Sequence, residues 1–301
     1  MTTPSAQPPA ELSPAQREID ALLIQVNEQI ETLTFDADNQ AILQRLVEGF
    51  SDSRGMTRLR IAETLGEIGE PATFVLTEAM LQHDDPVVRR ACAKTLTLIA
   101  DPRAVPALMT AFLNDEDTVV QGSAAGAMAR TGREAAPELL RILDSDYSES
   151  IKGHAAWALA FMGAEVKDLL YQALNSESEQ VRAAVIGAIA KVAQEEPQAD
   201  HCERLIQALE DDSQLVRSEA AATLGNLAYQ PAVSALVKLL SSEQAADRKA
   251  AALSLMKIRD AAAIAPLQTT LANEPDDGLK PVLQLAISQL EKRSAAADDW
   301  E

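Results

Sequence analysis

The chain has 301 residues, with 26 basic and 46 acidic side chains that give a formal net charge of −20 at pH 7. A surface this acidic repels phosphate backbones and anionic lipids, which argues against nucleic-acid binding and against membrane binding. Aromatic residues make up only 3% of the chain, and alanine is the commonest residue type. Because strands favour aromatic and β-branched side chains, this composition excludes an all-β fold and favours helices.

The two ends of the chain are polar. Residues 1–13 are rich in proline, and residues 294–301 form a short acidic tail, so both are predicted to lack order. The N-terminus has neither the basic flank nor the apolar core of a signal peptide, and no apolar run is long enough to span a membrane. The two cysteines, Cys92 and Cys202, fit a reducing compartment. We therefore expect a soluble, cytoplasmic protein without membrane insertion.

The first predicted element is an amphipathic helix within residues 14–35. Its apolar residues recur at helical spacing: Ile19, Leu22, Leu23, Val26 and Ile30. Since the helix precedes a run of repeats, it is expected to cap their N-terminal end, as the terminal units of repeat proteins must.

Residues 36–293 repeat with a period of about 31. A basic or amide residue recurs with successive differences of 31, 32, 31, 30, 35, 31 and 32 positions: Arg58, Arg89, Gln121, Lys152, Arg182, Arg217, Arg248 and Lys280. Such regularity is typical of a solenoid, which grows by stacking units. The predicted fold is all-α, a right-handed α-solenoid of about eight short HEAT-like helical hairpins with an N-terminal capping helix.

Each repeat is predicted to contain two helices joined by an acidic turn. Apolar or small residues stand 3, 7 and 10 positions after the basic column, which places them on the buried face of the second helix. Turn residues such as Asp84, Asp85 and Asp115 can cap that helix, and we expect the basic column to pair with turn carboxylates of the neighbouring repeat. The long step from Arg182 to Arg217 predicts a longer loop over residues 194–200.

The most complete repeat reads Asp-Asp-Pro-x-Val-Arg, then Leu-x-x-Ile-x-Asp-Pro-x-Ala-Val-Pro-x-Leu, between Asp84 and Leu108. This pattern resembles the short HEAT-like repeat of the phycobilisome lyases, and the resemblance covers about residues 37–292. Within that group the chain is similar to the E/F-type phycobilin lyases, the NblB-type proteins and the iron–sulfur-scaffold-associated HEAT protein of cyanobacteria. The resemblance implies a soluble cyanobacterial protein that acts on or holds another protein.

One helical face differs from the others. Positions 2, 5 and 9 after the basic column should point away from the stack, and in the fourth repeat they are His154, Trp157 and Phe161. The neighbouring repeats carry Gly126 and Gly187 beside them, which leaves space around Trp157, and Arg130 and Lys191 supply flanking cations. The stretch Ala155-Ala156-Trp157-x-Leu159 also matches the centre of a longer motif in the E-type lyases.

These seven residues predict a binding groove with an aromatic floor and a basic rim. The groove would suit an apolar ridge on a partner protein, or a flat conjugated ligand with carboxylates. The alternative interpretation is that Trp157 and Phe161 only pack the inner curve of the solenoid. The other candidate residues point to no catalysis: His83 lies in a turn, His201 and Cys202 are adjacent, and Cys92 falls at a buried position. Of the two thiols, that of Cys202 is the one expected to reach solvent.

The leading functional prediction is a non-catalytic, protein-binding scaffold for phycobilisome or phycobiliprotein biogenesis or turnover, which uses its concave surface. The partner would be a phycobiliprotein subunit or an assembly factor, and no cofactor is expected beyond a non-covalently bound bilin. The first alternative is an enzyme, a bilin lyase or lyase subunit that attaches phycocyanobilin, with the ligand over Trp157 and with Arg130 and Lys191 on its propionates. The second is an accessory partner of an iron–sulfur cluster scaffold.

Overall fold

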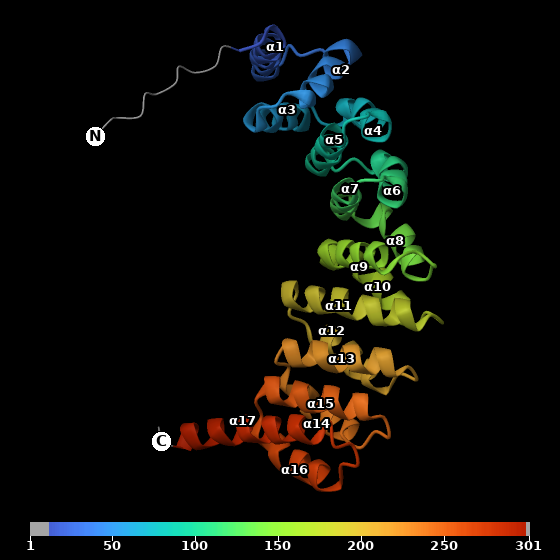
Figure 1. The fold of residues 1–301 in the computed structure, drawn as a ribbon, viewed down its shortest axis with the longest axis vertical. Helices are drawn as coiled ribbons and strands as arrows, with labels where there is room; N and C mark the ends of the chain where they lie inside the picture. The colour runs from blue at the N-terminus through green and yellow to red at the C-terminus, as the bar shows by residue number, and fades with distance from the viewer. Residues whose placement is uncertain (1–11, 299–301) are drawn as a thin grey trace, which may run out of the picture. The chain divides into compact units, whose positions relative to one another are not determined.

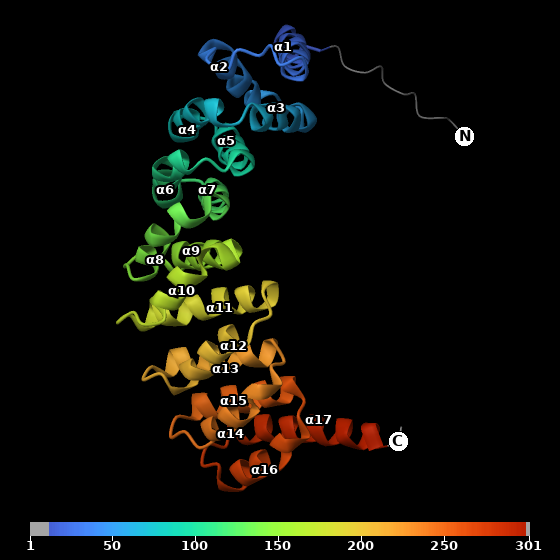
Figure 2. The same ribbon diagram turned by 180° about the vertical axis from the view of Figure 1, so that it is seen from behind.

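The computed structural model of the protein describes residues 12–298 (Figure 1, and from behind in Figure 2). All regular elements within this range are helices. The chain forms two compact units, Met1–Ala135 and Ala136–Glu301. In both, each repeat is a helical hairpin whose first helix packs against its second.

The first unit contains one single helix and three hairpins. Helix α1 (Pro14–Glu31) packs on the first hairpin, which consists of α2 (Gln40–Glu48) and α3 (Gly55–Ile68). The next two hairpins are α4 (Thr73–Gln82) with α5 (Pro86–Ile99), and α6 (Val105–Asn114) with α7 (Thr118–Thr131). The second helices α3, α5 and α7 lie side by side, so they form one layer of the unit.

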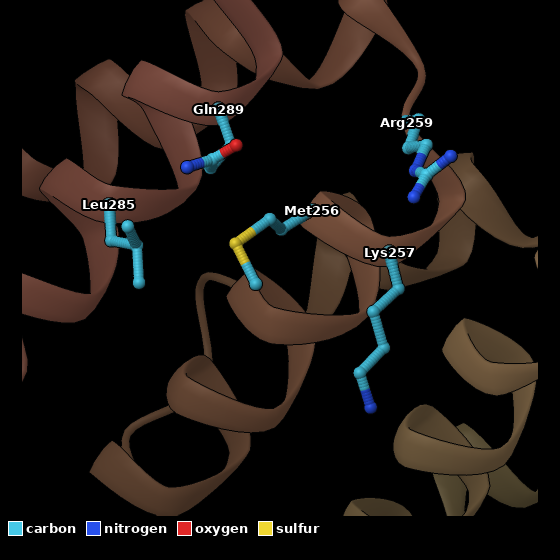
Figure 3. A pocket seen from close by; sticks show the side chains of 5 residues that line it. All are labelled: Met256, Lys257, Arg259, Leu285 and Gln289. Atoms are coloured by element: carbon cyan, nitrogen blue, oxygen red, sulfur yellow. The ribbon is translucent and has the colours of Figure 1, made fainter.

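The second unit contains five hairpins: α8 (Ala136–Leu143) with α9 (Glu149–Met162), α10 (Lys167–Ala173) with α11 (Glu179–Glu195), α12 (Ala199–Gln207) with α13 (Gln214–Asn226), α14 (Val233–Leu239) with α15 (Ala245–Ile258), and α16 (Ile264–Asn273) with α17 (Lys280–Asp298). The second helices α9, α11, α13, α15 and α17 pack in sequence order into one layer, as Figure 1 shows. Between α15 and α17 the side chains leave a pocket of about 420 Å³ (Figure 3).

Short 3-10 turns adjoin these helices, most of them leading into the first helix of the next hairpin. They are η1 (Gly49–Ser51), η2 (Glu70–Ala72), η3 (Pro102–Ala104), η4 (Gly132–Glu134), η5 (Gly163–Val166), η6 (Ala208–Glu210), η7 (Gln230–Ala232) and η8 (Ala261–Ala263). With three hairpins in one unit and five in the other, the prediction of an all-α solenoid of about eight HEAT-like hairpins is confirmed.

The layers are held together by small and apolar residues at the predicted buried positions. Cys92, Leu96, Ala155 and Leu159 are each at most 1% exposed. Helices α13 and α15 approach closely at one point: a Cβ atom on Gly225 would lie 2.7 Å from the Cα of Ser254. Only a residue without a side chain allows the two helices to pack at this distance.

The prediction of a longer loop over residues 194–200 is largely wrong. The extra residues extend α11, which has 17 residues against 14 in α9, and only residues 196–198 separate it from α12. Gln194 and Glu195 are good helix formers, whereas Pro197 cannot continue a helix, which explains where α11 ends.

The predicted terminal segments lie largely outside the described residues. Leu12 and Ser13 are the described residues of segment 1–13, and Ser13 caps α1 by accepting a hydrogen bond from the amide of Gln16. Helix α17 continues to Asp298 and therefore includes the first residues of segment 294–301. Among the helices of residues 12–298, none is long and apolar enough to cross a membrane.

Candidate functional site

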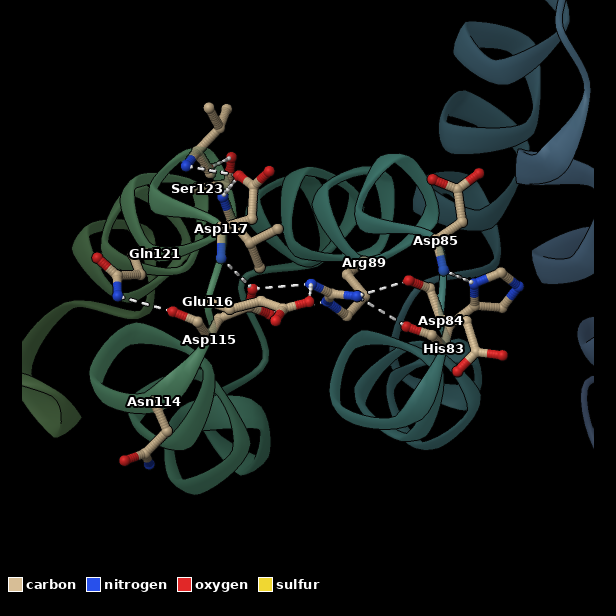
Figure 4. Close-up of polar contacts among 12 residues, drawn as sticks. His83, Asp84, Asp85, Arg89, Asn114, Asp115, Glu116, Asp117, Gln121 and Ser123 are labelled. Carbon is tan, nitrogen blue, oxygen red and sulfur yellow. Dashed lines mark hydrogen bonds and ion pairs between the residues drawn. The ribbon is translucent and has the colours of Figure 1, made fainter.

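The basic column joins neighbouring repeats. Arg89 donates from Nε and Nη2 to the two carboxylate oxygens of Asp115 in the next repeat, at 2.9 and 3.0 Å, and from Nη1 to the carbonyls of His83 and Asp84 in its own turn (Figure 4). The same arrangement recurs in the second unit in the pairs Arg182–Asp211 and Arg248–Glu274, and Arg217 contacts Asp247 of the next repeat through a single carboxylate oxygen. The predicted pairing with carboxylates of the neighbouring repeat is thus confirmed at these four positions.

These ion pairs explain the acid in the turns. The Arg182 and Arg248 guanidinium groups hold the pKa values of Asp211 and Glu274 below their usual range, because they donate hydrogen bonds to the charged carboxylates. Asp211 also accepts a hydrogen bond from the backbone amide of Ser213 and so orders its own turn. The column is therefore structural, and its arginines are already occupied.

Gln121 and Lys152 depart from this arrangement. Gln121 donates to the carbonyl of Asp115 in its own turn, at 2.8 Å. Lys152 lies 3.9 Å from Glu149 within α9. Both are middle members of the column, in the repeats that carry or adjoin Trp157.

The second-helix face consists of the positions 2, 5 and 9 residues after the basic column. None of these residues is buried in any of the eight repeats, as the helical spacing predicts. On α9, Trp157 and Phe161 are each 50% exposed, and their ring centroids lie 5.6 Å apart with the planes tilted by 35°. The indole therefore does not lie between the layers of the solenoid.

His154 lies one turn before Trp157 on the same face. Its Nδ1 atom is 2.8 Å from the carbonyl oxygen of Ser150, which fixes the ring along the helix. On the adjacent α11, Gly187 faces open space, since a Cβ atom there would meet nothing within 4 Å. The structure thus brings His154, Trp157, Phe161, Gly187 and Lys191 onto one surface of the second unit, here called the α9–α11 face.

The other two predicted site residues belong to the first unit. Gly126 and Arg130 lie on α7, where Arg130 is exposed and Gly126 also faces open space. The seven residues predicted from the sequence are therefore divided between the two units.

Sequence reasoning did not identify the partner of Lys191. Its Nζ lies 3.5 Å from Glu195, one turn further along α11, and both side chains are about half exposed. Glu195 also lies against Gly163 at the end of α9, where φ is +56° and a larger side chain would collide with the carboxylate. The spacing of four residues between Lys191 and Glu195 could have indicated the pair, but only with α11 extended beyond residue 194.

A second polar cluster, also unpredicted, connects α10 and α12. The hydroxyl of Tyr171 contacts Nδ1 of His201, and the guanidinium carbon of Arg204 lies 4.0 Å from the centre of the Tyr171 ring. His201 is 2% exposed, and its Nε2 atom has no hydrogen-bond partner in the described part of the chain. The 30 residues between Tyr171 and His201 match one repeat period, which is the only signal of their proximity in the sequence.

The expectation that Cys202 reaches solvent is wrong. Cys202 is 7% exposed and Cys92 is fully buried. Burial raises the pKa of the Cys92 thiol to about 12 and also raises that of Cys202, because a thiolate loses its hydration there. Cys202 is buried because it lies on the inner side of α12, which packs on α11 and α13.

Stacked two-helix repeats with an exposed second-helix face define a helical-repeat protein of the α-solenoid class. The chain belongs to the HEAT-repeat family, whose sequence profile matches residues 40–129, 73–160, 136–200 and 202–288. It is also 38% identical over 252 residues to the bilin biosynthesis protein MpeU of Synechococcus sp. (strain WH8020), covering 83% of this chain and 85% of MpeU. The resemblance to the HEAT-like repeats of the phycobilisome lyases is thereby confirmed.

Two solved structures are among those similar to this chain. Kap121p is 12% identical, with a TM-score of 0.54 over 93% of this chain and 36% of Kap121p. The complex of CpcE and CpcF of phycocyanin lyase from Nostoc sp. PCC7120 is 19% identical, with a TM-score of 0.35 over 82% of this chain and 94% of that chain.

Proposed function

We propose that this protein is a protein-binding HEAT-repeat scaffold in the biogenesis or turnover of phycobilisomes or phycobiliproteins. The observation that carries the proposal is the half-exposed pair Trp157 and Phe161 on the α9–α11 face. The 38% identity to a protein named for bilin biosynthesis supports the biological context. The partner is a phycobiliprotein subunit or a factor that assembles one.

The physical argument concerns the cost of exposed aromatic surface. Trp and Phe rings bury large areas, and each leaves half of its surface in water here, which is unfavourable unless something covers it. Trp is among the residues enriched at the energetic centre of interfaces. The open space beside Gly187 lets a partner's side chains approach the indole. Lys191 is a cation at the edge of the face, and an acidic residue of the partner can bind it together with Glu195.

The test is affinity capture from a cyanobacterial lysate with the Trp157→Ala/Phe161→Ala double variant. Both side chains are half exposed, so the variant should keep its helical melting transition. The amount of partner protein that it captures should fall at least tenfold. Phe74→Ala is the matched control, because Phe74 is 69% exposed on α4, a first helix in the other unit. Partners retained by the double variant but lost by Phe74→Ala would overturn the proposal.

The relationship to MpeU favours a second candidate function, a bilin lyase or lyase subunit that attaches phycocyanobilin to a phycobiliprotein. In this function the open-chain tetrapyrrole lies over Trp157, and Lys191 exchanges Glu195 for a propionate. Titration with phycocyanobilin should then shift the visible absorption band, and covalent transfer to an apo-phycobiliprotein should follow. A shifted band without transfer would indicate non-covalent bilin binding by a scaffold, and an unchanged spectrum would eliminate the lyase.

A further inference from the structure

The pocket between α15 and α17 combines an apolar floor with two cations. Met256 and Leu285 face each other across the pocket from α15 and α17, and Lys257, Arg259 and Gln289 complete its lining (Figure 3). Lys257, Leu285 and Gln289 belong to the second-helix face defined above. The pocket therefore opens on the same side of the second unit as the α9–α11 face, but in the last two repeats.

The two cations lie between two adjoining hollows. A second pocket of about 360 Å³ is lined by Gly225, Asn226, Ala228 and Ile258 together with the same Lys257 and Arg259. Lys257 and Arg259 therefore stand in a groove that crosses the C-terminal ends of α13 and α15. Leu285, which is 49% exposed, provides apolar surface at one end of this groove.

Neither cation is neutralised by a carboxylate among the side chains of residues 12–292. Lys257 donates from Nζ to the neutral side-chain oxygen of Asn226, at 2.7 Å, and the Arg259 guanidinium forms neither an ion pair nor a hydrogen bond within that range. In contrast, Arg89, Arg182, Arg217 and Arg248 of the basic column have carboxylate partners, as does Lys191. In a chain with a net charge of −20, two unneutralised cations in one pocket form a local site for an anionic group.

Arg259 reaches the pocket from the C-terminal end of α15. Arg259 ends α15 with φ +68° and ψ +36°, a left-handed conformation that residues with a side chain adopt only rarely. At the corresponding end of α5, Ala100 has the same conformation, with φ +54° and ψ +34°, whereas Gly69, Gly132 and Gly163 combine a positive φ with ψ between −128° and −138°. A cation at a helix C-terminus is mildly favourable, and at this position the Arg259 side chain lines both pockets.

We propose that this pocket binds an acidic side chain that a partner protein presents next to an apolar one. The carboxylate lies between Lys257 and Arg259, and the apolar residue packs on Met256 and Leu285. This second contact with the partner rests on the proposed scaffold function, in which the α9–α11 face makes the first contact, and it adds the chemistry that the partner must present. Because the pocket lies between α15 and α17, three to four helix spacings of 8–10 Å from α9, the two contacts are roughly 24–40 Å apart.

The direct test measures binding of three fluorescein-labelled synthetic helical peptides by fluorescence anisotropy with the full chain. The peptides differ only in two central residues one turn apart: Leu with Glu, Leu with Gln, and Ser with Glu. The Leu–Glu peptide should bind at least tenfold more tightly than either of the others, and its affinity should fall as salt is raised. Equal affinities for the three peptides would overturn the proposal.

Two variants locate the binding. Lys257→Glu/Arg259→Glu should weaken Leu–Glu peptide binding at least tenfold, whereas Lys238→Glu, an exposed charge reversal on the first helix α14, should leave it unchanged. Arg259→Gly removes the guanidinium and also the strained backbone, so it should weaken binding while the melting temperature stays constant or rises. A peptide affinity insensitive to both Arg259 variants contradicts the site.

The outcomes separate this inference from the proposed function. Loss of lysate partners in Trp157→Ala/Phe161→Ala, with no discrimination among the peptides, leaves the scaffold standing and overturns the second contact. Displacement of the Leu–Glu peptide by millimolar benzoate alone, with lysate partners unaffected by Lys257→Glu/Arg259→Glu, would show a small-carboxylate pocket and also overturn it. Peptide discrimination without any effect of the Trp157 variant on partners would instead remove the α9–α11 face from the proposed function.

Discussion

Arg248 and Glu274 form a buried, bidentate ion pair that joins the last two repeats, with Arg248 Nε 2.8 Å from Glu274 Oε2. The two residues are 8% and 5% exposed, and Arg248 also donates to the carbonyls of Ser242 and Glu243. Glu274 in turn accepts from the amide of Asp276. Each side chain thus orders the turn of its own repeat, and the ion pair joins the two turns.

We predict that Glu274→Gln destabilises the second unit by about 3 kcal/mol, since it leaves the Arg248 charge buried without its partner. The measurement is the free energy of unfolding from urea denaturation followed by circular dichroism. Glu138→Gln provides the control, because Glu138 pairs with Arg141 at the surface, where such pairs contribute about 0–1 kcal/mol. If the two variants lost equal free energy of unfolding, the buried ion pairs between repeats would contribute no more to stability than a surface pair.

Acid should weaken the first unit through Asp101. Arg103 and Thr73 donate hydrogen bonds to this buried carboxylate, and chiefly those from Arg103 lower the pKa of Asp101 from 3.8 to about 2. A carboxyl whose pKa is lower in the folded state contributes stability above its unfolded pKa and loses it as the pH falls from about 4 towards 2. Ionisation of Asp101 contributes at most about 2 kcal/mol to the free energy of unfolding. Solvent around the exposed Arg103 side chain screens the interaction and reduces this contribution.

The corresponding variant is Asp101→Asn. At pH 7 it should be less stable than the parent protein by no more than about 2 kcal/mol, and the two free energies of unfolding should converge as the pH approaches 2. A difference that stays constant across this range would show that packing, not ionisation, accounts for the effect.

Two glycine substitutions should change stability in opposite directions. Gly225→Ala places a methyl group 2.7 Å from the Ser254 backbone, so α13 and α15 must move apart, at a cost of about 1–3 kcal/mol. Gly153→Ala, in the middle of α9, meets nothing within 4 Å and should stabilise the helix by up to about 1 kcal/mol. Thermal melts of both variants check the pair, and the same sign for both would contradict the packing described here.

The thiols should be unreactive in the folded protein. Burial raises the pKa of Cys92 to about 12 and also raises that of Cys202, so at pH 8 neither forms an accessible thiolate. With Ellman's reagent we expect no fast phase in buffer and two equivalents of thiol after denaturation. Rapid modification of Cys202 under native conditions would show that α12 opens readily.

The repeat period accounts for most of what the sequence could predict. It placed the basic column next to the acidic turns, and helical spacing placed Trp157 and Phe161 on the exposed face. Both are consequences of short-range geometry repeated with a constant offset. The length of α11 escaped prediction because helix propensity continued through Gln194 and Glu195 up to Pro197, where a loop had been expected.

The remaining features depend on contacts between repeats. Tyr171 and His201 meet only when α10 and α12 pack on α11. The pocket at Lys257 and Arg259 depends on the left-handed end of α15, which the sequence favours at a glycine but not at an arginine. Backbone preferences therefore do not predict a left-handed conformation at position 259, and the pocket beside it could not be predicted from the sequence.

The most direct test of the scaffold function is photo-crosslinking with p-benzoyl-phenylalanine at position 161, compared with the same residue at position 74. Both sites hold an exposed phenylalanine, so the substitution is equally conservative at each. We predict that position 161 on α9 yields a specific protein adduct in cyanobacterial cells and that position 74 on α4 yields none. Adducts from position 74 with none from position 161 would contradict the account.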